Sequence, residues 1–198
     1  MVFENRRWFL KRLSQTLGAA TAATLIAGNG ISTALAYQPR QDSADSDGAV
    51  LTQKQMQILR SVCETILPRT DTPSAADLDC HGFIDHQISQ CYSVDAQQSL
   101  IRCLDDINEH SQANYKVQYN QLDIEKQQKI LIDIEQQQGF TQYQKEHFKF
   151  LKGLVVFGFF TSEVGATQVL AYQAVPGGYK GSIPVTPGTK AWGSLNFY

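Results

Sequence analysis

Apolar residues recur at the three- and four-residue spacing of an α-helix in five stretches of the chain. Polar residues and residues that begin or end helices separate these stretches. The pattern predicts an all-α fold, a compact bundle of about five helices. The expected helices cover about residues 52–67, 80–91, 95–111, 123–138 and 141–160.

Capping residues mark the ends of several of these helices. Thr52 is followed three residues later by Gln55, the capping-box arrangement, and Pro68 stops the first helix. Asp123 caps the fourth helix and Gly139 ends it. The first four helices are expected to turn these residues toward the core: Met56, Leu59, Val62, Cys63, Ile66, Cys80, Phe83, Ile84, Ile88, Cys91, Leu100, Cys103, Leu104, Ile107, Ile124, Ile130, Leu131 and Ile134.

The fifth helix and the segment after it differ from the rest of the chain. The C-terminal half of this helix is apolar on nearly all sides, which indicates burial or contact with a partner. After Ala171 the sequence becomes rich in Gly and Pro and loses any helical or strand period, so we expect an irregular C-terminal tail. Aromatic residues in such a tail indicate packing on another surface. They are Tyr172, Tyr179, Trp192, Phe197 and Tyr198.

The first 36 residues have the features of an export signal. Residues 13–38 carry no charge and are only mildly apolar, unlike the run of about 20 apolar residues in a transmembrane helix. Ala34 and Ala36 then predict cleavage before Tyr37. We therefore expect export through the twin-arginine translocase and a location in the periplasm. The alternative is an uncleaved N-terminal anchor. The twin-arginine pattern is carried by Arg6, Arg7, Phe9, Leu10 and Lys11.

These features divide the chain into a twin-arginine signal peptide (1–36), a flexible linker (37–49) and a helical domain (50–198). The linker prediction rests on the polar, Asp-rich sequence that follows the cleavage site. The 162 residues after cleavage suffice for one domain with a core. They contain 13 basic and 18 acidic residues, a formal charge of −5, which gives no electrostatic reason to bind nucleic acid.

The sequence contains no motif for a cofactor or for catalysis. Glycine patterns for nucleotides are absent, as are a Cys-x-x-Cys-His haem motif and a serine in a nucleophile elbow. His81 and His86 are five residues apart, which does not place both rings on one helix face. Cys80 beside His81 would suit a metal, but a solvated histidine beside a buried cysteine is the simpler interpretation. We expect no catalytic, cofactor-binding or metal-binding residue in this chain.

The four cysteines are expected to meet an oxidising compartment after export. If the first three helices form antiparallel hairpins, Cys80 lies level with Cys63 and nearly level with Cys103, and Cys91 lies near a turn. Cys80 and Cys91 cannot pair, because eleven helical residues span about 16 Å. The sequence allows either one disulfide, with Cys80–Cys103 as the candidate, or four free thiols.

Two sequence motifs stand near the start and the end of the helical domain. The first is Leu51-Thr52, followed by Ile66-Leu67-Pro68-Arg69-Thr70-Asp71-Thr72-Pro73-Ser74-Ala75 and Gly82-Phe83-Ile84-Asp85. The second is Gly158-Phe159-Phe160-Thr161-Ser162-Glu163-Val164-Gly165-Ala166, followed by Leu170-Ala171-Tyr172 and Val175-Pro176-Gly177. In this order, behind a twin-arginine leader, they resemble the gluconate 2-dehydrogenase subunit 3 family over about residues 50–185.

The resemblance implies an accessory subunit that is not itself catalytic. Such subunits accompany a large flavin-dependent dehydrogenase of the glucose–methanol–choline class, which holds FAD, and a multihaem cytochrome c, which holds haem c. The large subunit oxidises CH–OH groups of sugars or sugar acids and is thought to be exported with the small one. The alternative from another class is a stand-alone periplasmic helical binding protein.

We expect the partner subunit to bind the C-terminal third of the chain, from about residue 157 to residue 198. In this region Gly158 and Gly165 also suit close packing at a helix break, and Ser162 suits a cap for the next turn. The candidate interface residues are Phe157, Phe160, Ser162, Glu163, Gly165, Tyr172, Pro176, Gly177, Tyr179 and Trp192.

Overall fold

The computed structural model describes residues 37–172, 177–178, 181–182 and 184–192. Its elements are η1 (Ser43–Asp45), α4 (Gln53–Ile66), α5 (Cys80–Cys91), α6 (Val94–Tyr115), η2 (Tyr119–Gln121), α7 (Ile124–Glu135), α8 (Gln142–Thr161) and the π-helical turn η3 (Gly165–Val169). The predicted all-α bundle of five main helices is confirmed. The export residues Arg6, Arg7, Phe9, Leu10, Lys11, Ala34 and Ala36 lie outside the described residues.

The helices begin where the capping residues predicted. Thr52 and Gln55 form a reciprocal capping box at the start of α4, and Thr141 begins α8 in the same way. The side chain of Asp123 accepts a hydrogen bond from the first turn of α7. The chain reverses after α7 through Gly139, whose φ of +79° is readily adopted only by glycine.

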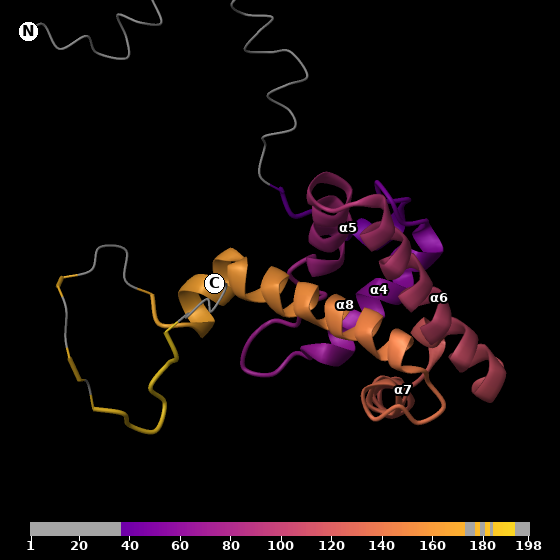
Figure 1. The fold of residues 1–198 in the computed structure, drawn as a ribbon. Helices are drawn as coiled ribbons and strands as arrows, with labels where there is room; N and C mark the ends of the chain where they lie inside the picture. Colours follow the sequence, from indigo (N-terminus) through magenta and orange to yellow (C-terminus); the bar gives the residue numbers. More distant parts are fainter. Residues whose placement is uncertain (1–36, 173–176, 179–180, 183, 193–198) are drawn as a thin grey trace, which may run out of the picture. The chain divides into compact units, whose positions relative to one another are not determined.

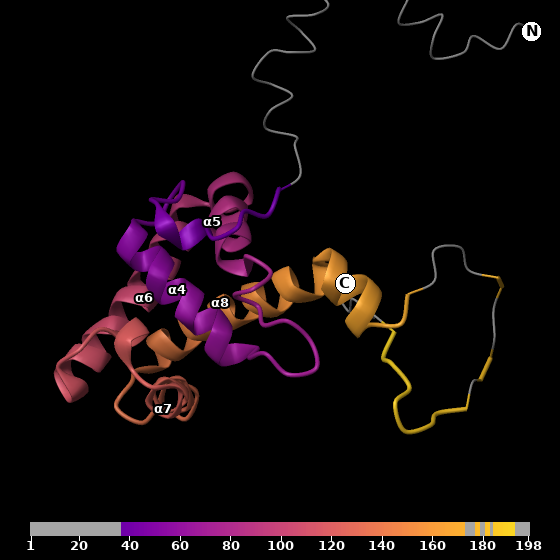
Figure 2. The ribbon, with the colours of Figure 1, turned by 180° about the vertical axis from the view of Figure 1, so that it is seen from behind.

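Helix α8 lies at the centre of the bundle and contacts each of the four other long helices. In Figure 1, α5 and α6 lie on one side of it and α7 on the other, and the reverse view in Figure 2 places α4 across it. Burying an aliphatic or aromatic side chain contributes about 1.5–3 kcal/mol, so this contact is a main source of stability. The buried side of α8 consists of His147, Phe148, Leu151, Leu154, Val155, Gly158 and Phe159.

Two residues expected to point inward are exposed at helix ends. Ile124 is the first residue of α7 and remains 43% exposed, while Ile130 and Ile134 further along the helix are buried. Cys91 is the last residue of α5 and is also exposed. Helical spacing gives the direction of a side chain but not the point at which neighbouring helices cease to cover it.

Residues 39–51, called here the N-terminal strap, are held against α5 and do not form the flexible linker expected over 37–49. The carboxylate of Asp85 accepts hydrogen bonds from the backbone N–H groups of residues 49–51, with N···O distances of 2.5, 3.0 and 2.9 Å. Ala44 is buried in the core. The strap has few apolar side chains, and its composition therefore predicted flexibility. Its backbone is nevertheless bound by the carboxylate of Asp85, a residue far along the chain whose contact cannot be read from composition.

A second buried carboxylate, that of Asp79, holds the earlier part of the strap. It accepts hydrogen bonds from the N–H of Arg40 (2.8 Å) and from the N–H and hydroxyl of Ser43 (3.2 and 2.8 Å). His81 Nε2 lies 3.1 Å from Asp79 and 3.0 Å from Asp42. His81 is fully buried, so the solvated histidine expected from the sequence is wrong. Both carboxylates contact the same ring nitrogen, whereas the other ring nitrogen, Nδ1, is buried without a hydrogen-bond partner among the described residues.

This cluster shifts two ionisation equilibria. Burial lowers the pKa of His81, and the nearby carboxylates of Asp79 and Asp42 only partly oppose this, so the pKa lies below the ordinary 6.5. Burial raises the pKa of Asp42, but the N–H of Ala44, the hydrogen bond with His81 and the Arg60 guanidinium outweigh burial and bring it below 3.8. In both cases the unfolded chain binds a proton more readily than the folded chain.

The free energy of unfolding should therefore fall as the pH is lowered. The His81 contribution begins to be lost as the pH falls through 6.5, and the Asp42 contribution is lost at lower pH, as the pH falls through its folded-state pKa. One proton changes the stability by at most about 1.4 kcal/mol per pH unit. Urea titrations at pH 7.5, 6.5, 5.5 and 4.5 measure the slope. The variant His81→Gln should have a shallower slope between pH 7 and 5, and an unchanged slope would contradict this assignment.

Candidate partner interface

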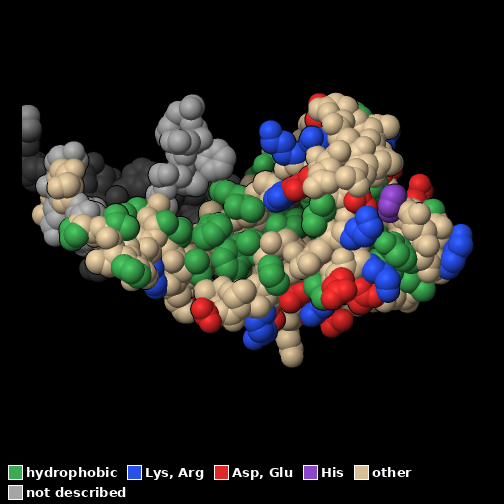
Figure 3. Space-filling view, turned by 90° about the horizontal axis from the view of Figure 1, so that it is seen from below, with side chains coloured by type: hydrophobic (Ala, Val, Ile, Leu, Met, Phe, Trp, Pro, Cys, Tyr) green, Lys and Arg blue, Asp and Glu red, His purple; other side chains and the backbone are tan. Residues whose placement is uncertain are grey.

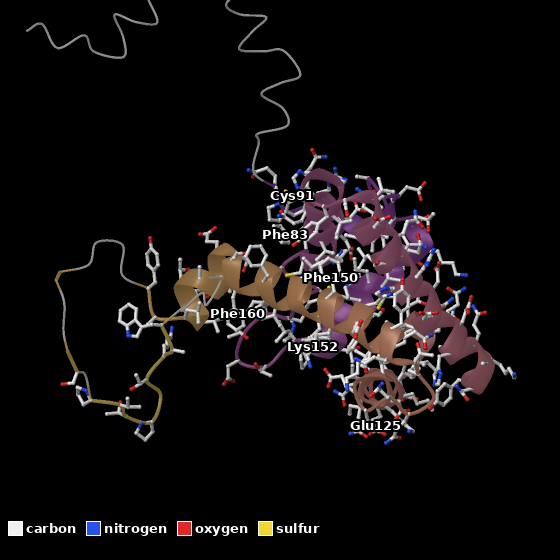
Figure 4. The ribbon with its side chains drawn as sticks, in the orientation of Figure 1. Phe83, Cys91, Glu125, Phe150, Lys152 and Phe160 are labelled. Carbon is white, nitrogen blue, oxygen red and sulfur yellow. The ribbon has the colours of Figure 1, made fainter. Side chains whose placement is uncertain are left out.

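The outward side of α8 carries aromatic residues predicted to contact a partner. Phe157 and Phe160 are half-buried, and Val156 is 37% exposed. The Phe157 ring packs against Phe83 of α5, with ring centroids 6.0 Å apart. Figure 4 labels Phe150 and Phe160 on α8 and Phe83 on the neighbouring α5. On the face seen in Figure 3, hydrophobic side chains gather in the middle and charged side chains gather toward one end.

An apolar groove of about 730 Å³ lies between α8 and the C-terminal end of α5. Tyr92, which ends α5, packs edge-on against Phe150 with ring centroids 5.5 Å apart. A side chain at Gly153 would meet no atom within 4 Å, so this glycine leaves the groove open. Its lining residues are Gln87, Tyr92, Glu146, Lys149, Phe150, Gly153, Leu154 and Phe157.

The turn after α8 is fixed by Ser162 and Gly165. The Ser162 hydroxyl donates to the carbonyl of Phe159 (2.6 Å) and accepts from the N–H of Gly165 (3.1 Å), the capping role expected from the sequence. A Cβ on Gly165 would lie 2.0 Å from the carbonyl oxygen of Phe159, so the backbone approach requires glycine. At Gly158 a Cβ would lie 2.9 Å from the Phe83 ring. Among the candidate residues of this turn, Glu163 is exposed.

The described part of the tail returns to the end of the η3 turn. The N–H of Ala171 donates to the carbonyl of Ala191 (2.8 Å), and Ala171 and Trp192 form an isolated parallel bridge. The bridge brings Tyr172 and Trp192 close to the C-terminal end of α8, and their side chains are 62% and 54% exposed. Gly177 is also exposed, whereas Pro176 and Tyr179 lie outside the described residues.

The four cysteines are free thiols in the structure, so the Cys80–Cys103 disulfide that the sequence suggested is not formed. Cys80 lies against α8, with its Cβ 3.8 Å from the position that a Cβ on Gly158 would take. The assumption of antiparallel hairpins predicts which residues lie at the same height along neighbouring helices. It does not predict which way their side chains point. Burial raises the pKa of both Cys80 and Cys103 to about 12, which keeps these thiols protonated and unreactive.

Within the described residues, no group of three or more His, Cys, Asp and Glu side chains is arranged to hold a metal ion. In the same part of the chain, none of the helices has the length and apolar content needed to cross a membrane.

The described residues form an all-α domain with an apolar groove between α5 and α8. A family model described as gluconate 2-dehydrogenase subunit 3 matches residues 53–177, and the chain belongs to this family. The family's name describes its members as subunits of a multi-subunit gluconate dehydrogenase. No curated protein and no solved structure matches the chain.

The groove between α5 and α8 was not found from the sequence. Phe150 and Tyr92 are 58 positions apart and belong to different helices, and helical spacing does not show that their rings meet. The one feature of the sequence that could have indicated the groove is Gly153. A glycine in the middle of a helix lowers the stability of that helix, so its presence there calls for a structural reason. Its position has a structural explanation only once the neighbouring rings are placed.

Two glycine-to-alanine substitutions in this region should have opposite effects. Gly165→Ala should destabilise the domain by about 1–3 kcal/mol, because the added Cβ collides with the Phe159 carbonyl oxygen. Gly153→Ala should stabilise it by up to about 1 kcal/mol, because alanine favours the helix and the position is open. Thermal and urea unfolding compare the two variants with the original chain. Equal effects of the same sign would show that the close approach at Gly165 is wrong.

Proposed function

We propose that this chain is the accessory small subunit of a periplasmic flavin-dependent dehydrogenase of the gluconate 2-dehydrogenase type. The observation that carries the proposal is the family match over residues 53–177, which includes all five long helices. In this role the chain supplies no catalytic group. FAD belongs to the large glucose–methanol–choline-type subunit, and haem c belongs to a cytochrome subunit that receives the electrons. Oxidation of a CH–OH group of a sugar or sugar acid is the large subunit's reaction.

The leader gives this subunit a second task, the export of its partner. A twin-arginine leader serves proteins that are translocated in the folded state, so a partner bound before translocation crosses the membrane with the chain that carries the signal. A flavoprotein must fold and take up FAD before it is active. Assembly in the cytoplasm followed by joint export into the periplasm satisfies both requirements, and the small subunit then assists the folding and stability of the large one.

The surface at the C-terminal end of α8 supports binding of the large subunit there. Phe157 and Phe160 lie on α8, and the Ala171–Trp192 bridge adds two exposed aromatic side chains, Tyr172 and Trp192. Aromatic side chains of this kind are frequent anchors at protein interfaces. The groove beside Phe150 extends the apolar surface toward α5. We therefore add the groove between α8 and α5 to the partner interface that was proposed from the sequence.

Replacing both exposed aromatic residues, Tyr172→Ala with Trp192→Ala, should weaken binding of the large subunit. Loss of one interface anchor typically costs about 2 kcal/mol or more, roughly thirtyfold in Kd, and the pair should cost more. The measurement is the amount of FAD-containing large subunit that co-purifies with the tagged small subunit from the periplasm and membranes.

A matched control is Tyr143→Ala, which removes an aromatic side chain that is also 54% exposed but lies at the opposite end of α8. This variant should retain the flavoprotein in normal amount. Normal recovery with the double variant, or equal loss with Tyr143→Ala, would place the interface elsewhere.

A further inference from the structure

The outward side of α8 changes from polar to apolar along the helix. Exposed positions at helical spacing run along it: Gln142, Glu146 and Lys149, then Gly153 and Val156. The groove between α5 and α8 spans this change, because its lining includes the charged Glu146 and Lys149 as well as apolar residues further along α8. Whatever fills the groove therefore meets an apolar floor with charged groups at one end.

Gly153 keeps the floor of the groove low, and no contact within the chain explains it. A Cβ at Gly153 would meet no atom within 4 Å, whereas a Cβ at Gly158 or Gly165 would collide with Phe83 or with the Phe159 carbonyl oxygen. A glycine in the middle of a helix lowers the stability of that helix. It also allows another backbone to approach closely. The space at Gly153 thus fits a backbone that comes from outside the described domain.

The groove has helices as its walls, and this limits the kind of segment that fits. In the middle of α8 the backbone N–H and C=O groups are bonded within the helix, so they cannot pair with an extended strand. A second helix satisfies its own backbone groups and can lay one apolar side into such a groove. The axes of packed helices lie about 8–10 Å apart, and a glycine at the contact favours the shorter distance. The groove volume of about 730 Å³ accommodates several large side chains.

Lys149 places a positive charge beside the apolar part of the groove. It is exposed and forms no ion pair with another described residue, whereas Lys152 on the same helix pairs with Glu135. Lys149 lies one helical turn from Gly153, and Glu146 lies about one turn further away. The charge nearest to the apolar floor is therefore positive, and it is complementary to a carboxylate on the partner.

We propose that the groove between α5 and α8 receives one amphipathic helix of the large flavoprotein subunit. The apolar side of this helix packs on Phe150, Gly153 and Phe157, and an acidic residue at its edge faces Lys149. The proposal rests on the subunit role proposed above and names the part of the partner that binds here. The incoming helix covers the side of α8 that the four other long helices leave exposed.

The test is a competition between two forms of the full-length chain for one large subunit. The original chain and a variant carry different tags and are produced together with a limiting amount of the large subunit, and the FAD recovered with each tag is measured. Gly153→Leu fills the groove, because a helical side chain leans over the preceding turn, here toward Phe150. It should recover roughly ten- to a hundredfold less FAD than the original chain. Its unfolding temperature should not fall, because leucine favours the helix and the position is open.

Lys149→Glu tests the charge at the end of the groove. It should recover roughly three- to tenfold less FAD at low salt, and the difference should shrink at high salt. The matched controls are Gln142→Leu and Lys145→Glu, which make the same kinds of change on α8 outside the groove lining. Both controls should compete as well as the original chain. Equal recovery of FAD with Gly153→Leu and with the original chain would overturn the proposal.

A crosslink identifies the segment that occupies the groove. The photoreactive residue p-benzoylphenylalanine, in place of Gln87 on the α5 wall, should attach to a peptide of the large subunit. This peptide should have apolar residues at helical spacing and an acidic residue nearby. A crosslink to a second copy of the chain, to its own tail or to lipid overturns the proposal, while FAD recovered with the original chain still supports the subunit role. If the original chain recovers no FAD, both the subunit role and the proposed helix are wrong.

Discussion

The structure depends on burial of one apolar helix by the four other long helices. Helix α8 is the last of the five long helices in the sequence, and it contacts α4, α5, α6 and α7. The bundle is therefore incomplete until α8 is in place. Because α8 is apolar on more sides than its neighbours cover, its burial is also incomplete. Val156, Phe157 and Phe160 remain partly exposed, and Gly153 leaves a groove beside Phe150. The feature that holds the domain together thus also provides the surface that we assign to a partner.

The polar interior is organised by carboxylates at the start of α5. Asp79 and Asp85 are buried, and each binds backbone N–H groups of the strap. A buried carboxylate that accepts several hydrogen bonds is well solvated by the protein, whereas the same strap without these acceptors would leave unpaired N–H groups near the core.

Local signals in the sequence predicted most of the helical framework. Thr52, Asp123 and Thr141 begin helices because each side chain can satisfy a free backbone N–H of the first turn, and this is a property of a few neighbouring residues. The helix break at Ser162 and Gly165 is local for the same reason. Contacts between residues far apart in the sequence could not be predicted from such local signals. The linker prediction failed at the strap because its partners are Asp79 and Asp85, about 35 residues ahead.

The same limit applies to the candidate site. Aromatic residues in an irregular tail indicated a contact surface, and Tyr172 and Trp192 are indeed exposed near the end of α8. The groove was missed because Tyr92 and Phe150 meet only in the folded chain. The antiparallel hairpins gave the level of Cys80 along the helices but did not show that it also packs against Gly158 of α8. The direction of a side chain and its burial by neighbouring helices depend on how the helices pack. Helical spacing alone does not specify this packing.

The central claim is that this chain carries a flavoprotein partner across the membrane. Its most direct test is the location of the large subunit in cells whose only small subunit has Arg6→Lys and Arg7→Lys. FAD-containing large subunit and dehydrogenase activity should then both be retained in the cytoplasm, together with the variant chain. Export of the large subunit to the periplasm at the normal level would contradict the claim.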